Sequence, residues 1–205
     1  MNFSKIKVAY FSATGTTQKV VRHLANHLSE VFNLPLEECD FTLPQQRQNP
    51  LVFNADELVV FGTPVYAGRV PNVLLKYLTT MQAEGAKAIA VVVYGNRDYD
   101  DALMELSDIL SNAGAQVFAA GAFIGEHSFS YTLAAGRPDK DDFEKIETFA
   151  QQIVDKTKDE CFTKPEIKGV RCPQHAKQFV DANYLFHKED VERKNQRRAE
   201  AEWFV

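Results

Sequence analysis

Ile6-Lys-Val-Ala-Tyr-Phe-Ser-Ala-Thr-Gly-Thr-Thr-Gln18 is the stretch of the chain that decides its fold. Its apolar half, Ile6–Phe11, predicts a buried strand, and an amphipathic helix is predicted directly after the stretch. Backbone N–H groups at the start of a helix are unpaired and the helix dipole is positive there, so the turn between the two suits a phosphate. The alternative is that Thr16 or Thr17 only caps the helix. The hydroxyl and glycine residues of this turn are Ser12, Thr14, Gly15, Thr16 and Thr17.

Two common nucleotide-binding motifs are absent from this turn. It contains no lysine or arginine, so it is not the Gly-x-x-x-x-Gly-Lys-Ser/Thr loop, and it also lacks the Gly-x-Gly-x-x-Gly pattern. A phosphate held here would be bound by neutral donors.

The composition is that of a globular protein. The chain has 205 residues, of which 45% are hydrophobic and 25% charged, enough for one ordinary domain and an extension. No apolar run approaches the length of a membrane span, and the first residues lack the apolar stretch of a secretory signal, so we expect a cytoplasmic protein with no membrane partner. The formal net charge of −5 argues against nucleic acid as the main partner.

Residues 1–160 are predicted to form one domain, and residues 161–205, which differ in composition, a partly helical C-terminal extension. The terminal aromatic residues Trp203 and Phe204 either pack on the domain or are offered to another chain. The three cysteines are widely spaced, so neither a disulfide framework nor a zinc site is indicated. The extension also holds a basic cluster, interleaved with acidic residues and therefore interpreted as a solvated helix face: Arg193, Lys194, Arg197 and Arg198.

Hydrophobic periodicity predicts five strands and four helices in alternation. Such a chain favours right-handed parallel connections, a three-layer α/β sandwich and a ligand site at the carboxyl ends of the strands. Gly121 is expected to break the fifth strand. The predicted strands are Ile6–Phe11, Leu34–Asp40, Glu57–Pro64, Ala88–Val93 and Gln116–Ile124; the predicted helices are 18–31, 72–80, 102–112 and 139–158.

Three histidines lie where chemistry is conceivable. His23 and His27 are four residues apart on the first helix, a spacing that can bind a metal, but no acidic third ligand lies nearby in sequence, so we expect a solvated face and no metal. His127 follows the fifth strand at the ligand edge. It is either a proton donor to the ligand or a histidine hydrogen-bonded within its loop.

Three loops at this edge together resemble the flavodoxins. Ser12-Ala-Thr-Gly-Thr-Thr17 is similar to the family's FMN phosphate loop, Thr63-Pro-Val-Tyr-Ala-Gly-Arg-Val-Pro71 to its second flavin loop, and Tyr94-Gly-Asn-Arg-Asp-Tyr99 to its third. Within the family, residues 5–157 look most like the flavodoxin half of proteins that fuse a flavodoxin to a two-cluster ferredoxin. The iron–sulfur module is missing, because downstream only Cys172-Pro173 remains of its cysteine run.

The resemblance implies a five-stranded parallel sheet in the order 2-1-3-4-5, with FMN as the cofactor. Tyr66 is the implied stacker on the flavin ring, and Tyr94 and Tyr99 either stack or only pack. A peptide of the second loop would change conformation during redox chemistry, which needs positive φ and fits Ala67-Gly68. The implied FMN-binding residues are Ser12, Ala13, Thr14, Gly15, Thr16, Thr17, Pro64, Val65, Tyr66, Ala67, Gly68, Tyr94, Gly95, Asn96, Arg97 and Tyr99.

The function implied is electron transfer by bound FMN between protein partners, such as a reductase or a ferredoxin-type donor. No catalytic side chain is assigned. Two alternatives remain: an FMN-dependent reductase of a quinone-like or other conjugated small molecule, and a flavin-free interaction module. Arg69 and Arg97 either ease the second reduction of the flavin, attract an anionic substrate, or point to solvent.

Overall fold

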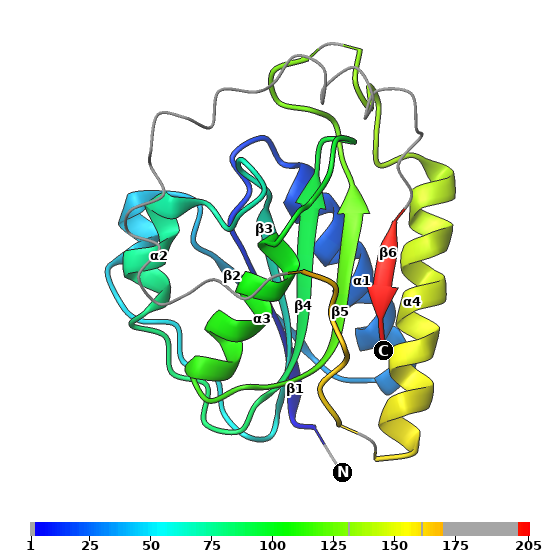
Figure 1. The fold of residues 1–205 in the computed structure, drawn as a ribbon. Coiled ribbons are helices and arrows are strands. Elements are labelled where there is room, and N and C mark those ends of the chain that lie inside the picture. Colours follow the sequence, from blue (N-terminus) through cyan, green and yellow to red (C-terminus); the bar gives the residue numbers. More distant parts are fainter. Residues whose placement is uncertain (1–2, 131, 161, 170–200) are drawn as a thin grey trace.

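The computed structural model describes residues 3–130, 132–160, 162–169 and 201–205 (Figure 1). It contains one six-stranded sheet in the order β2-β1-β3-β4-β5-β6. Strands β1 to β5 pair in parallel and β6 is antiparallel to β5. The predicted order 2-1-3-4-5 is confirmed, with a sixth strand added at the edge. The strands are β1 Lys5–Tyr10, β2 Leu36–Asp40, β3 Glu57–Pro64, β4 Lys87–Tyr94, β5 Gln116–Ile124 and β6 Glu202–Phe204.

Helices cover both faces of the sheet, as the three-layer prediction requires (Figure 1). One hydrophobic core lies under α2 and α3, and a second lies under α1 and α4. Alternate residues of β3 feed the two cores, since Leu58 belongs to one and Val59 to the other. This explains why the central strands are continuously apolar. The helices are α1 Thr16–Phe32, α2 Asn72–Leu78, α3 Ala102–Asn112 and α4 Lys140–Lys158, with a short 3₁₀ turn, Pro44–Arg47, in the connection after β2.

The prediction that Gly121 breaks the fifth strand is wrong. β5 runs without interruption through Gly121, and the register irregularity on this side of the sheet lies at Ala88/Ile89. A Cβ at Gly121 would lie 2.7 Å from the Phe123 ring and 3.3 Å from that of Phe149. Glycine is present here because aromatic rings occupy the space, which is a use of glycine that the isolated strand pattern does not reveal.

The C-terminal aromatic residues pack on the domain, which was one of the two expectations. Trp203 lies opposite Gly121 in the β5–β6 ladder and stacks on Phe123, with ring centroids 6.5 Å apart. The predicted tail helix, the basic cluster Arg193–Arg198, Cys161 and Cys172 lie outside the described residues. Within the part that is described, none of the helices has both the length and the apolar character of a membrane span.

His23 does not lie on a simple solvated face. Its Nε2 is 3.0 Å from the Glu147 carboxylate of α4, and its ring packs against Phe143 at 4.6 Å. The described residues nevertheless contain no group of three or more His, Cys, Asp or Glu side chains placed to hold a metal ion. His23 therefore serves to join α1 to α4.

Candidate functional site

The hydroxyl-rich turn links β1 to α1 through a left-handed glycine. Gly15 has φ of 82° and Thr16 is the first helical residue. Gly15 is the N-cap residue of α1, and neither threonine of the capping alternative provides a side-chain cap. Ser12 instead accepts one of the first helical N–H groups, that of Gln18, on its Oγ at 3.0 Å. Thr17 is buried, with its methyl group 3.2 Å from the position that a Cβ on Gly62 would take. Thr17 thus packs the helix against β3.

The outer side of the same turn is a cradle of free donors. The backbone N–H groups of Thr16 and Thr17 open the helix and have no acceptor among the residues that the structure describes. The hydroxyls of Thr14 and Thr16 lie 3.3 Å apart, and the space beside Gly15 is open, with no atom within 4 Å of a built Cβ. These groups converge on a place suited to an anion.

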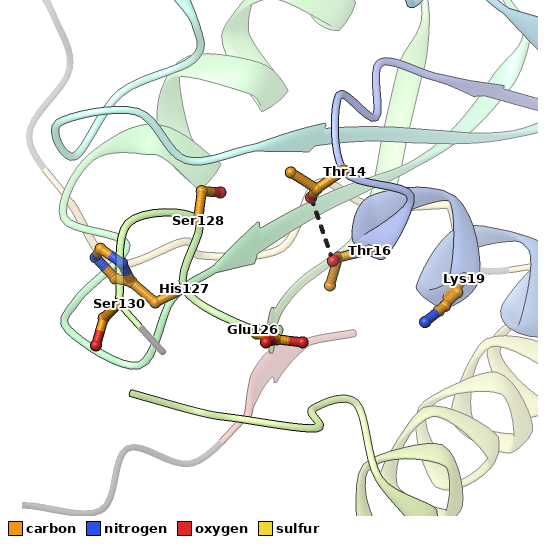
Figure 2. Close-up of a pocket in the computed structure, with 7 residues that line it drawn as sticks. All are labelled: Thr14, Thr16, Lys19, Glu126, His127, Ser128 and Ser130. Atoms are coloured by element: carbon orange, nitrogen blue, oxygen red, sulfur yellow. Dashed lines mark hydrogen bonds between the residues drawn. The ribbon is translucent and has the colours of Figure 1, made fainter. Parts of the chain in front are cut away.

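A cavity of about 230 Å³ opens against this cradle. Thr14 and Thr16 face the loop that follows β5 across it, and Lys19 reaches its rim from α1 (Figure 2). Sequence reasoning did not identify Lys19 as part of the site, although it lies one helical turn after Thr16 and so on the same face. The other lining residues, all from the loop after β5, are Glu126, His127, Ser128 and Ser130.

The second predicted flavin loop is a tight two-residue turn. Tyr66 and Arg69 exchange backbone hydrogen bonds of 2.9 and 3.1 Å, and the residues between them, Ala67 and Gly68, have φ of 50° and 76°. The predicted positive φ at Ala67-Gly68 is confirmed. Tyr66 itself is 42% exposed and packs edge-on against Phe11 at 6.4 Å. Its ring therefore presents a free surface at the carboxyl edge of the sheet.

The third loop touches the second one. The Asp101 N–H donates to Gly68 O at 3.2 Å, and a Cβ on Gly68 would lie 2.5 Å from the Asp100 carboxylate. Two non-glycine residues of this loop, Asn96 and Asp100, have positive φ of 59° and 44°. Backbone conformations of this kind are costly and persist where surrounding contacts hold them.

Tyr94 and Tyr99, the first and last residues of the third loop, are buried. Each is 4% exposed, and their rings meet edge to face at 5.6 Å. The Tyr99 hydroxyl donates to Glu202 Oε2 at 2.6 Å. Burial raises the pKa of both phenols, and the hydrogen bond to Glu202 raises the pKa of Tyr99 further. Of the two roles expected for these tyrosines, packing is the one that the structure shows.

Both arginines of the two loops are paired with carboxylates. The Arg69 guanidinium donates to both oxygens of Glu105, at 2.9 and 2.7 Å, and Arg97 donates to Asp100 at 2.8 Å. Their side chains are 32% and 30% exposed. The solvent-facing alternative therefore does not describe them, and each positive charge is offset by an adjacent negative one.

His127 is hydrogen-bonded within its own loop, as one alternative held. The Phe129 N–H donates to His127 Nδ1 at 3.1 Å, and the ring packs so closely on Gly95 that a Cβ there would lie 2.6 Å from Cδ2. His127 thus places the loop after β5 against the third loop. The same loop is tied to α4, because the Glu126 N–H donates to Arg137 O at 3.0 Å and the Arg137 side chain forms a buried ion pair with Asp142.

Comparison with solved structures finds proteins of the same fold. A flavodoxin of Streptococcus pneumonia TIGR4 is 18% identical over 74% of this chain and 98% of its own, with a TM-score of 0.51. An apo NADH:FMN oxidoreductase is 14% identical over 73% and 87%, with a TM-score of 0.53. The rubredoxin oxygen:oxidoreductase of Desulfovibrio gigas is 15% identical over 78% and 37%, also with a TM-score of 0.53.

Identities this low show a shared fold. A search of curated protein sequences finds no match. A model of the flavodoxin domain family, by contrast, matches residues 7–130, which span β1 to the loop after β5 and include all three candidate flavin loops. The chain therefore belongs to the flavodoxin domain family.

Proposed function

We propose that this protein binds FMN and passes electrons between protein partners. The observation that carries the proposal is the cradle at the start of α1. Thr14 and Thr16, whose hydroxyls are adjacent, line a cavity at the positive end of a helix. The open Gly15 lies between them, and the N–H groups of Thr16 and Thr17 have no acceptor in the described structure. Every helix start has unpaired N–H groups, so the features that favour a phosphate here are the two adjacent threonine hydroxyls and the open space beside Gly15.

The residues present fit the phosphate of FMN. Thr14, Gly15 and Thr16 would bind it through hydroxyl and backbone N–H groups, Ala13 would add its backbone, and Ser12 holds the turn in shape through its bond from Gln18. The helix dipole and the Lys19 side chain at the rim would offset part of the negative charge, each by about 0.3–1 kcal/mol at an exposed site. Thr17 contributes its N–H group and anchors the helix.

The flavin ring would lie at the second and third loops, and FMN supplies the one- and two-electron chemistry. Tyr66 offers the exposed aromatic face, and the positive φ of Ala67 and Gly68 suits a peptide that changes orientation during redox chemistry. Tyr94 and Tyr99 support the ring site from beneath. The remaining proposed contacts are the backbones of Pro64, Val65, Gly95, Asn96 and Arg97.

We further propose that residues 1–160 form the FMN-binding domain and that residues 161–205 are an extension whose last strand completes the sheet. The acidic charge of the chain suits a redox partner with a basic docking surface. A cytoplasmic location and the likeness to the flavodoxin half of the ferredoxin fusions stay predictions.

Titration of the apoprotein with FMN, followed by quenching of flavin fluorescence, tests the proposal. We expect the double variant Thr14→Ala, Thr16→Ala to bind FMN at least about tenfold more weakly, because hydrogen bonds to a charged group contribute about 1.5–3 kcal/mol each. Riboflavin, which lacks the phosphate, should bind more weakly than FMN and be indifferent to the substitutions. Thr148→Ala, an exposed threonine of α4, is the matched control. No binding of FMN, or equal affinity for riboflavin, would refute the proposal.

A further inference from the structure

The C-terminal strand β6 is fixed on the α4 side of the sheet by one aromatic residue. Trp203 packs against Phe123 and Phe149, with ring centroids 6.5 and 6.3 Å away, and its indole N–H donates to Gln152 Oε1 of α4 at 2.7 Å. Gly121, opposite Trp203 in the ladder, leaves the room that these rings need. Figure 1 shows β6 between β5 and α4.

The residues on either side of Trp203 point to the other face of the sheet, because side chains alternate along a strand. Phe204 packs on the core beneath α2 and α3, whereas Trp203 packs on the core beneath α1 and α4. Glu202 shares the face of Phe204, and there it accepts the hydrogen bond from the Tyr99 hydroxyl at 2.6 Å. The exposed Lys168 Nζ lies 3.9 Å from the other oxygen of Glu202 and forms a weak surface pair with it.

Tyr99 connects this contact to the third loop. Its ring packs on Tyr94 at the end of β4, and the residues between and after them adopt costly conformations at Asn96 and Asp100. The Asn96 side-chain oxygen is buried without a hydrogen-bond partner among the described residues. The loop is held in part from within, by the bond from Arg97 to Asp100. The Glu202–Tyr99 bond adds support from another segment, because it joins the loop to a residue 103 positions away in sequence.

We propose that β6 positions the third loop of the flavin site, with Glu202 as the positioning residue and Tyr99 as the side chain through which it acts. The proposal rests on the function proposed above and adds that the C-terminal end of the chain sets the affinity for the flavin ring. It predicts that loss of the Glu202–Tyr99 bond weakens the contacts to the flavin ring and leaves the contacts to the phosphate unchanged.

The first experiment uses the apoprotein and needs no ligand. Hydrogen exchange of the backbone amides of residues 95–101 is compared in the wild type, Glu202→Ala, Glu202→Gln and the control Glu166→Ala, an exposed glutamate on the segment after α4. We expect exchange about tenfold faster in Glu202→Ala, because a charge-assisted hydrogen bond is lost. Glu202→Gln keeps an acceptor for the phenol, so its exchange should stay close to that of the wild type. The control Glu166→Ala should exchange at the wild-type rate.

The second experiment measures FMN and riboflavin affinity of the same variants. Glu202→Ala should weaken both ligands by the same factor, about five- to tenfold. Tyr99→Phe removes the donor of the bond to Glu202. The double variant Glu202→Ala, Tyr99→Phe should therefore lose no more affinity for either ligand than Tyr99→Phe alone. A loss confined to FMN would place the effect at the phosphate loop and overturn the positioning role.

The two proposals fail in different ways. If the wild type does not bind FMN, the proposed function is refuted whatever the variants do. If the wild type binds FMN and Glu202→Ala changes neither the affinity nor the exchange of residues 95–101, the function stands and the positioning role is refuted.

Discussion

Substitution of Gly125 by alanine should displace Thr16 and so weaken binding at the proposed phosphate site. Gly125 directly follows β5, and its backbone is fixed by a hydrogen bond from its N–H to Tyr94 O at 3.0 Å. A Cβ here would lie 2.3 Å from Thr16 Cγ2 and 2.7 Å from Val93 Cγ1. Ordinary contacts begin at 3.4 Å, so Thr16, on the turn that we propose to bind phosphate, has to move by about 1 Å.

The expected magnitude follows from the cost of such overpacking. Extra methyl groups in tight sites cost about 1–3 kcal/mol. If the displacement of Thr16 from the phosphate accounts for this cost, FMN affinity falls by a factor of about 5 to 150. Fluorescence titration with FMN measures the change, and thermal melting of the apoprotein measures how much of the cost falls on the fold instead.

Gly136→Ala is the matched control within the same connection. Gly136 has φ of 75°, but no atom lies within 4 Å of a built Cβ. The variant should therefore lose about 1–2 kcal/mol of stability through backbone strain and keep wild-type affinity for FMN. The reasoning is refuted if Gly125→Ala binds FMN as tightly as the wild type, or if Gly136→Ala loses as much affinity.

Three further predictions concern the anchor of the loop after β5 and the two ring loops. Asp142→Asn leaves the buried Arg137 charge paired only with the more exposed Asp139 carboxylate, 3.3 Å away, and should lower the free energy of unfolding by about 1–3 kcal/mol in urea titrations; a change within about 0.5 kcal/mol would contradict this. Burial alone would raise the pKa of Asp142, but hydrogen bonds, chiefly from Arg137, lower it below its ordinary value. The ion pair therefore stabilises the wild type above about pH 4, and this stabilisation is lost as the pH falls below that value. Asp142→Asn should not show this loss, because it has no carboxylate at this position. Gly68→Ala, at φ of 76°, should distort the second loop and weaken FMN and riboflavin equally, about fivefold or more; loss of FMN alone would show that this loop does not contact the ring. Glu105→Gln should leave the Arg69 charge less compensated and raise the reduction potential of bound FMN by tens of millivolts, on the order expected for one partly screened charge; potentiometric titration that gives an unchanged or lower potential would exclude an influence of Arg69.

The five parallel strands were predictable from the sequence because their determinants are local, whereas their order came from the resemblance to the flavodoxins and β6 was not predicted. The apolar runs of β3 and β4 and the helical periodicity of α1 each identify an element without knowledge of the rest. The mistaken break at Gly121 shows the limit of that reasoning: a glycine weakens an isolated strand, but in β5 its missing side chain accommodates the rings of Phe123 and Phe149. That requirement exists only once β5, β6 and α4 have been brought together.

The candidate site likewise has one part that the local sequence predicts and another that depends on tertiary packing. The phosphate cradle is built from consecutive residues, so its hydroxyls, glycine and helix start could be found by inspection. The wall of the cavity opposite it comes from the loop after β5, more than 100 residues later in the chain, and which of its side chains face the cradle depends on how that loop folds. The pairing of Arg69 with Glu105 likewise depends on how α3 approaches the second loop, which no spacing in the sequence encodes.

The C-terminal strand β6 is the element whose contacts depend most on the folded structure. Glu202-Trp-Phe204 has no feature that would connect it with a flavin, and the family match ends at residue 130. Its alternation of side chains nevertheless sends Trp203 into one core and Glu202 to the buried phenol of the third loop. An open β5 edge would invite pairing with a foreign strand, and β6 covers the part of that edge from Ala120 to Ala122. In the same three residues it contacts Tyr99, which is how we propose that the ring site extends beyond the part of the chain that the family model matches.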